Sequence, residues 1–92
     1  MKSIELEVTN PSGLHARPAA LFVRTAGSHR SRIGVRNVTR GTAEVDGKSI
    51  ISVLGLGVSR GHRIAVSADG DDEDTAIEAI RDAVEGGLGE ST

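Results

Sequence analysis

Alternating hydrophobic and polar residues predict β-strands in this chain, because a period of two buries one face of a strand and leaves the other in solvent. The clearest case is the segment 2–8, and the segment 62–67 repeats the pattern. Two shorter strands are expected on either side of a turn near residues 39–41. The inward positions of these strands are Ile4, Leu6, Val8, Ile33, Val35, Ala43, Val45, Ile64 and Val66.

Helices are predicted where hydrophobic residues recur at intervals of three and four. The first covers residues 16–26 and stops at Gly27, a residue typical of helix ends. The last covers residues 71–85, where acidic residues in the first turn suit the positive end of the helix dipole. Between them, residues 49–54 form a short apolar segment with Ser49 in the N-cap position. The helical residues expected in the core are Ala19, Phe22, Val23, Ala26, Ala76, Ile77, Ile80 and Val84.

The order of these elements is β-α-β-β-α-β-α, which predicts an α+β fold. Each strand is apolar on one side only, so three helices should cover one face of a four-stranded, mainly antiparallel sheet. The other face should be charged, and some of the arginines between positions 24 and 40 are expected to pair with Glu5 and Glu7. The charged residues expected on that face are Glu5, Glu7, Arg32, Arg36 and Arg63.

The length of 92 residues is enough for one small domain, expected over residues 1–88. Residues 89–92 are expected to form a flexible tail, and the glycine-rich stretch that begins at Gly86 also has the composition of a linker cut from a longer polypeptide. No apolar run approaches the roughly 18 residues of a membrane span, and the first residues have no signal-peptide core. The chain has no cysteine, which excludes disulfides and thiolate chemistry. The expected compartment is the cytoplasm.

Charge and composition argue against binding of nucleic acid. The net charge is −2, from 11 Lys and Arg against 13 Asp and Glu, whereas nucleic-acid binders are normally basic. Phe22 is the one aromatic residue, so the stacking platforms of single-strand binders are missing.

Two segments resemble ligand-binding loops without meeting their requirements. Residues 41–49 nearly match a P-loop, but five residues separate the two glycines where four are needed. Residues 69–74 begin like an EF-hand loop, but the sixth position holds Asp74 where that loop needs glycine. His29 and His62 have no ligand-like spacing to His15. We therefore predict no cofactor and no metal ion.

The segment 13–20 carries the most informative chemistry. His15 lies where a turn meets the start of the first helix, and Pro18 suits the first turn because its missing N–H has no partner to lose there. Unpaired backbone N–H groups and the helix dipole at this point favour a phosphate group, and Arg17 adds a forked donor. A neutral imidazole is a nucleophile, so this pattern suits a group that accepts a phosphoryl group and gives it away again. The alternative interpretation, that His15 only caps the helix, is equally consistent with the spacing.

A candidate partner surface lies on the face of the first helix opposite its core stripe. It combines apolar side chains with an arginine rim, which suits a partner with an acidic rim. The short apolar segment adds to it, because a helix of about six residues cannot bury all of its large side chains. The residues of this partner surface are Arg17, Ala20, Leu21, Arg24, Ile50, Ile51 and Leu54.

The motif Gly13-Leu14-His15-Ala16-Arg17-Pro18-Ala19 resembles the active-site signature of HPr, the histidine phosphocarrier of the bacterial phosphoenolpyruvate:sugar phosphotransferase system. The resemblance extends to Lys48-Ser49-Ile50, Leu56-Gly57-Val58 and Ser67-Ala68-Asp69-Gly70, and so covers nearly the whole chain. It implies the open-faced β-sandwich of that family, which agrees with the predicted order of elements.

The resemblance also implies a role for each matching residue. His15 would carry the phosphoryl group on Nδ1, taking it from Enzyme I and passing it to a IIA-type domain for sugar uptake, while Arg17 and the amides of Ala16 and Arg17 hold the phosphate. Ser49 matches the serine that HPr kinase/phosphorylase modifies in some members. The first helix and the segment around Ile50 would contact Enzyme I and the acceptor. The protein would act as a monomeric carrier, without membrane insertion, and not as an enzyme.

Two features depart from the family pattern: a longer connection near residues 37–41, and Asp46-Gly47 ahead of Lys48, which bears on recognition of Ser49 by a kinase. Two alternatives also stay open. One is an HPr-like domain of a specialised or multidomain protein, in a dihydroxyacetone-kinase or nitrogen-related branch. The other is a module that docks protein or RNA with His15 in a structural role. The sequence does not identify the sugar, the acceptor or the regulatory partners.

Overall fold

The computed structural model of the chain describes residues 1–90 and contains the expected elements in the expected order. They are β1 (Lys2–Glu7), α1 (Ala16–Gly27), β2 (Arg32–Asn37), β3 (Val45–Asp46), α2 (Ile50–Gly55), β4 (Arg63–Asp69) and α3 (Glu73–Glu85).

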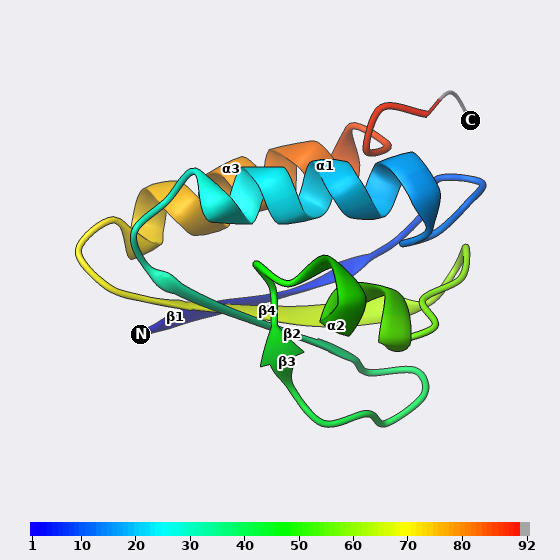
Figure 1. Cartoon of the computed structure of the whole chain (residues 1–92), viewed down its shortest axis with the longest axis horizontal. Helices are drawn as coiled ribbons and strands as arrows, with labels where there is room; N and C mark the ends of the chain where they lie inside the picture. The colour runs from blue at the N-terminus through cyan, green and yellow to red at the C-terminus, as the bar shows by residue number, and fades with distance from the viewer. Residues whose placement is uncertain (91–92) are drawn as a thin grey trace.

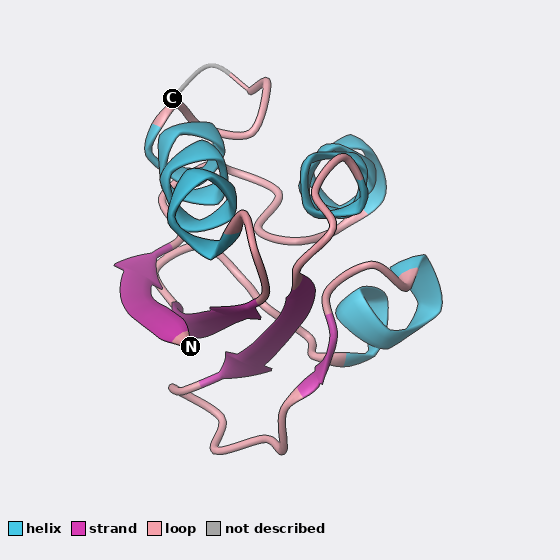
Figure 2. Cartoon of the chain, turned by 90° about the vertical axis from the view of Figure 1, so that its left-hand side faces the viewer, coloured by secondary structure: helices cyan, strands magenta, loops and turns pink. Residues whose placement is uncertain are grey.

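In this part of the chain, four strands form one sheet in the order β1-β4-β2-β3, and all neighbouring pairs are antiparallel. The helices lie on one face of it: α1 and α3 run side by side above the sheet, and α2 lies beside α1, near β3 (Figures 1 and 2). The other face is open to solvent. The predicted fold class is therefore confirmed. No helix of the described residues combines the length and apolar character that a membrane span needs.

The core lies between the sheet and the helices. Phe22 of α1, Ile64 and Val66 of the inner strand β4, and Ile80 of α3 are fully buried in it. Most of the inward positions predicted from periodicity belong to this core, and Ile4, Val23 and Val45 pack at its margin.

Ala43 is a correction, because it is exposed and lies outside any strand. The strand β3 has only two residues, Val45 and Asp46, opposite Val35 and Gly34 of β2. Just before it, the side chain of Glu44 lies against Gly34 and accepts a hydrogen bond from Ser67 Oγ on β4 (2.9 Å). This path of the chain across the open face replaces the longer strand that alternation predicted.

The partner of Glu5 is a second correction. Its carboxylate pairs with Arg63 Nε at 2.8 Å, and no ion pair within residues 1–90 joins Glu5 or Glu7 to an arginine between positions 24 and 40. The reason is the strand order: β4 lies between β1 and β2, so Arg63 is the neighbour of β1 and Arg36 is one strand further away.

The start of α3 is set by a tertiary contact. The three-and-four spacing and the acidic residues predicted a start at Asp71, but the helix begins at Glu73 with Asp72 in the N-cap position. The Asp72 carboxylate accepts hydrogen bonds from Ser31 Oγ, Ser31 N and Arg30 N, and so joins α3 to the connection between α1 and β2. These donors, Ser31 Oγ first, lower the pKa of Asp72 from 3.8 to about 2.

This carboxylate is expected to make folding stability depend on pH. Because the pKa of Asp72 is lower in the folded state, its stabilising contribution is complete above pH 3.8 and is lost as the pH falls through about 2. The difference in free energy of unfolding between the wild type and Asp72→Asn should therefore be greatest near neutral pH and shrink across that window. Urea unfolding at a series of pH values measures it. Asp71→Asn, at an exposed neighbouring position, is the control and should change stability little. A difference that stays constant down to pH 2 would contradict the prediction.

Candidate functional site

The loop between β1 and α1 is held against the rest of the fold before it reaches His15. Leu14 is fully buried, and its N–H donates to the carbonyl of Val58 at 3.0 Å. Gly13 has a φ of +61°, and a Cβ at this position would collide with the same carbonyl. Glycine is therefore required where the loop passes over the segment that follows α2.

His15 is at the N-cap position of α1, with extended backbone angles (φ −128°, ψ 157°). Its side chain is exposed and makes no capping hydrogen bond. The imidazole accepts no hydrogen bond from the N–H groups at the start of α1. The side chain of His15 therefore does not cap the helix. Its ring nitrogens are left for chemistry with an incoming group.

The first turn of α1 offers backbone donors beside His15. The N–H groups of Ala16 and Arg17 are in the first turn, where no intrahelical acceptor exists, and Pro18 has no N–H. Ala16 has a φ of 51°, a left-handed conformation that costs a residue with a Cβ about 1–2 kcal/mol. A left-handed residue followed by a helical one turns successive N–H groups toward one point, which forms a small anion-binding concavity. Ala16, with its left-handed φ, and Arg17, in the first helical turn, are the two residues predicted to contact the phosphate.

The outer face of α1 is exposed as predicted. Arg17, Ala20 and Arg24 are in solvent, and Leu21 is half-buried. These four residues form one side of a groove, and its other side comes from the C-terminal segment, through Leu88, Gly89 and Glu90. The α1 residues of this groove were predicted from the sequence, whereas the contribution of the C-terminal segment was not.

The predicted apolar residues of α2 are also on the surface. The exposed fractions are 39% for Ile50, 81% for Ile51 and 39% for Leu54, while Val53 is buried. Ser49 is the N-cap of α2 as predicted, and its Oγ accepts a hydrogen bond from Ser52 N (3.3 Å). The candidate partner surface therefore spans the neighbouring helices α1 and α2 (Figure 2). Its residues are Arg17, Ala20, Leu21 and Arg24 of α1 and Ile50, Ile51 and Leu54 of α2.

His15 and Ser49 are at different ends of this surface. Lys48 Nζ donates to the carbonyl of His29 at 2.8 Å, so the start of α2 lies near the C-terminal end of α1. His15 is at the opposite end of α1 (Figure 1). The structure therefore brings His15, Ala16 and Arg17 together and places Ser49 away from them.

Sequence reasoning missed the residues that hold the loop before His15. Glu90 Oε1 accepts from Asn10 Nδ2 (2.9 Å) and Ser12 N (2.9 Å), and its Oε2 accepts from Ser12 Oγ (2.7 Å). The hydrogen bonds from Asn10 and Ser12 lower the pKa of Glu90. Glu90 belongs to the segment 89–92 that was expected to be a flexible tail; residues 91 and 92 of that segment lie outside the described residues. Nothing local in the sequence indicates this contact, since the residues it joins are 78 and 80 positions apart.

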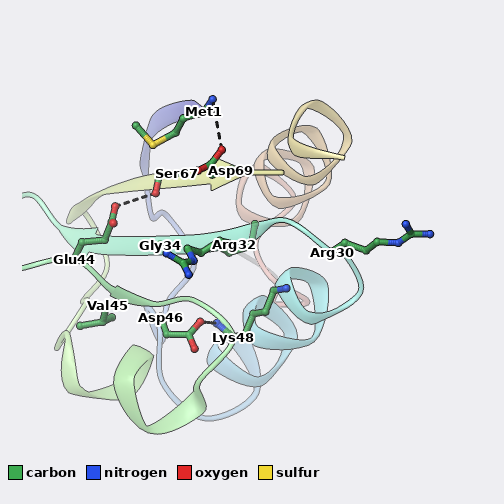
Figure 3. A pocket seen from close by; sticks show the side chains of 11 residues that line it. Met1, Arg30, Arg32, Gly34, Glu44, Val45, Asp46, Lys48, Ser67 and Asp69 are labelled. Atoms are coloured by element: carbon green, nitrogen blue, oxygen red, sulfur yellow. Dashed lines mark hydrogen bonds and ion pairs between the residues drawn. The ribbon is translucent and has the colours of Figure 1, made fainter. Parts of the chain in front are cut away.

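Another hollow, on the open face of the sheet, contains none of the predicted site residues. Figure 3 shows its side chains, which include both basic and acidic groups. The acidic groups have partners within the hollow: Ser67 Oγ donates to Glu44, the backbone N–H of Lys48 donates to Asp46 Oδ1 (2.9 Å), and the N-terminal amine lies 3.8 Å from Asp69 Oδ1. Within residues 1–90, no three side chains of the metal-binding types come together. The candidate site is the start of α1, where exposed His15 adjoins Ala16 and Arg17.

Comparison with known proteins identifies the family. A family model described as "PTS HPr component phosphorylation site" matches residues 2–86. The chain belongs to the HPr family. The family model describes a phosphorylation site, and relatives that are 35–36% identical to this chain are called phosphocarrier protein HPr.

Relatives of this HPr-family chain are of two kinds. It is 36% identical over 85 residues to the phosphocarrier protein HPr of Neisseria meningitidis serogroup A, covering 92% of each chain. It is 42% identical over 88 residues to the multiphosphoryl transfer protein of Salmonella typhimurium, covering 96% of this chain but 23% of that protein. The chain therefore spans about a quarter of the length of the multiphosphoryl transfer proteins that it matches.

The fold comparison agrees with the family. The crystal structure of HPr-C-His from Thermoanaerobacter tengcongensis superposes with a TM-score of 0.93 at 46% identity, covering all of both chains. The predicted resemblance to HPr is confirmed by both comparisons.

Proposed function

We propose that His15 accepts a phosphoryl group from phosphorylated Enzyme I and passes it to IIA-type domains for sugar uptake. The observation that carries the proposal is the exposed imidazole of His15, which makes no capping hydrogen bond and lies next to the first turn of α1. The N–H groups of Ala16 and Arg17 have no intrahelical acceptor there. A site with one accessible nucleophile and an adjacent anion cradle suits a group that must meet two partners in turn.

In the proposed transfer, one P–N bond breaks in the donor as another forms here. The lone pair of His15 Nδ1, the atom implied by the family, attacks the phosphorus, and the donor's imidazole nitrogen leaves. The phosphoryl oxygens then receive hydrogen bonds from the amides of Ala16 and Arg17 and from the Arg17 guanidinium. The positive end of the α1 dipole favours the same charge. The reverse events at a IIA-type domain return His15 to its starting state, so the protein is a carrier and not an enzyme.

The test is an intact-mass assay with phosphoenolpyruvate and Enzyme I, on the wild type and on His15→Ala. One acid-labile phosphoryl group on the wild type and none on the variant is the expected result. Labelling of both proteins would assign the phosphate to another residue. No labelling of either, with several Enzyme I preparations, would oppose the proposal and favour a docking module.

We also propose that the partner surface binds Enzyme I and the acceptor domain in turn, so that both partners contact the same residues. Its exposed apolar centre on α2 and its arginine rim on α1 complement a partner with an apolar patch and acidic rim. Leu21 packs partly against the core, so Ile51, at 81% exposure, gives the cleaner test of this surface.

Ile51→Glu is expected to raise the KM for this protein as the substrate of Enzyme I by about tenfold, because a charge replaces an apolar contact and faces an acidic rim. Steady-state phosphotransfer at varied carrier concentration measures it. Thr75→Glu, an exposed position on α3, adds the same charge away from the surface and should leave KM unchanged. If Ile51→Glu and Thr75→Glu changed KM equally, α2 would not be part of the interface with Enzyme I.

Ser49 is proposed as a site of regulatory phosphorylation by an HPr kinase/phosphorylase. The support is its place at the start of α2, next to exposed Ile50 and Ile51. A phosphate there would put negative charge on the partner surface and repel an acidic rim, slowing transfer. Mass analysis after incubation with such a kinase and ATP, with Ser49→Ala as the control, tests it; a phosphate that persists in the variant would contradict the assignment.

A second candidate has an observation of its own. The identity of 42% with a multiphosphoryl transfer protein, over 23% of its length, favours an HPr-like domain that serves a larger or specialised phosphotransfer protein. A neighbouring gene for Enzyme I and sugar permeases would favour the general role, and a neighbouring dihydroxyacetone kinase would favour the specialised one. The proposed state is a monomer in the cytoplasm.

A further inference from the structure

We propose that Glu90 is a positioning residue that holds the loop before His15 in place for phosphoryl transfer. The inference rests on the proposed function of His15. It is carried by three hydrogen bonds that join the C-terminal segment to the loop of residues 10–14.

Glu90 holds this loop through both of its carboxylate oxygens. Oε1 accepts hydrogen bonds from Asn10 Nδ2 and Ser12 N, and Oε2 accepts one from Ser12 Oγ. The donor–acceptor distances are 2.7–2.9 Å. Asn10 is fully buried, and its Nδ2 also donates to the carbonyl of Gly13 at 2.9 Å. One carboxylate therefore fixes the backbone at Ser12 directly and at Gly13 through Asn10, three and two residues before His15.

The chain after α3 is built to bring Glu90 to this place. Gly87, Leu88 and Gly89 have φ values of 86°, 50° and 82°, so three successive left-handed residues turn the chain back toward α1 (Figure 1). Leu88 is 1% exposed and belongs to the core, which anchors the turn. Gly89 then passes beside the Leu21 side chain of α1. A segment that only trailed into solvent would need neither the buried leucine nor the left-handed turn.

The effect on chemistry follows from how His15 is held. Its imidazole makes no capping hydrogen bond, so its position is determined by the backbone on either side. On the helix side it is fixed by α1, and on the other by Leu14, whose N–H binds Val58, and by the Glu90 contacts. Loss of the Glu90 carboxylate leaves Ser12 without these two hydrogen bonds and Asn10 with only its bonds to Gly13, which allows the loop to shift. A displacement of about 1 Å at a reacting group can lower a rate by about 100-fold.

The charge of Glu90 does not oppose a phosphoryl group at His15 in this arrangement. Three donors surround the carboxylate, and Arg17 and Arg24 share its groove. The hydrogen bonds, and not the charge, are thus the part of Glu90 that positions the loop.

Two variants separate these contributions. Glu90→Ala removes all three hydrogen bonds. Glu90→Gln removes the charge but keeps them, because the amide oxygen still accepts from Asn10 and Ser12 N, and the amide nitrogen donates to the Ser12 hydroxyl. Glu85→Ala, an exposed glutamate at the end of α3, is the matched control.

The experiment measures kcat and KM for phosphorylation by Enzyme I, together with the amide hydrogen exchange of residues 12–17 in the free protein. We expect Glu90→Ala to lower kcat by about tenfold or more with KM unchanged, and to speed exchange at Ser12 and Leu14, whose N–H groups are hydrogen-bonded in the loop. Glu90→Gln and Glu85→Ala should behave like the wild type. The double variant Glu90→Ala/Ser12→Ala should be little slower than Glu90→Ala alone, since both changes break the same contact.

Each other outcome counts against the proposal. An unchanged kcat in Glu90→Ala would make the contact structural only, and a raised KM alone would make Glu90 part of the docking surface. If the wild type accepts no phosphoryl group, the proposed function fails. The exchange data then still decide whether Glu90 holds the loop, and unchanged exchange at Ser12 and Leu14 in Glu90→Ala would overturn that as well.

Discussion

Replacing Arg17 with alanine is expected to lower the rate constant for phosphoryl transfer to His15 by about 100-fold, the usual effect of removing one donor aimed at developing negative charge. Arg17 is exposed, two residues after His15, and its N–H is one of the unpaired donors in the first turn of α1. The alanine variant keeps that backbone N–H and loses only the guanidinium. Rapid-quench kinetics with phosphorylated Enzyme I measure the effect.

Arg24→Ala is the matched control for this prediction. Arg24 is on the same face of α1, exposed and in the same groove, but nearly two turns further along the helix. Loss of the Arg24 side chain should weaken docking alone, which raises KM and leaves the rate constant for transfer unchanged. Arg17→Lys should fall between the wild type and Arg17→Ala, because an ammonium keeps the charge without the forked donor. If Arg17→Ala and Arg24→Ala slow transfer equally, Arg17 contributes only to the charged rim.

Replacing Gly13 with alanine is expected to lower the free energy of unfolding by about 2–4 kcal/mol and to slow transfer as well. The φ of +61° is unfavourable for any residue with a Cβ, and that Cβ would collide with the carbonyl of Val58. The loop must then move away from the segment after α2, and the hydrogen bond from Leu14 N to Val58 is weakened. For a chain of this size, whose total stability is on the order of 5–14 kcal/mol, such a loss is readily measured by urea unfolding.

The same substitution at Gly27 should have the opposite sign. Gly27 ends α1, its φ is not left-handed, and a Cβ there would meet no atom within 4 Å. Gly27→Ala should therefore raise stability by up to about 1 kcal/mol, through helix propensity and a less flexible unfolded chain. A Gly13→Ala variant as stable as the wild type would show that the loop can shift freely, which would also weaken the case that its position matters for His15.

Much of the fold was predictable because its signals are local. Alternation in β1 and β4, the three-and-four spacing of α1 and α3, and the serine ahead of α2 each concern residues a few positions apart. The candidate site was equally local: the residues from His15 to Pro18 are consecutive, and their relation to the helix start follows from their order. The length of β3 was overestimated because it depends on contacts between segments that are distant in the sequence. β3 pairs with β2 over two residues, and the side chain of Glu44, just before β3, accepts a hydrogen bond from Ser67 of β4 on the open face.

The amino-acid sequence alone thus determined the order of the helices and strands, the buried face of each, and the presence of a histidine at a helix N-terminus. These features depend on the periodicity of hydrophobic residues and on residues that are adjacent in the chain. The tertiary structure decided which strands are adjacent, and with that the pairing of Glu5 with Arg63. It also decided the joining of Asp72 to Ser31 and of Glu90 to Ser12. These contacts link residues 41–78 positions apart, where side chains meet only because the packed core brings their backbones together. No local propensity encodes such a meeting, and for that reason the residues that hold the His15 loop could be recognised only in the folded chain.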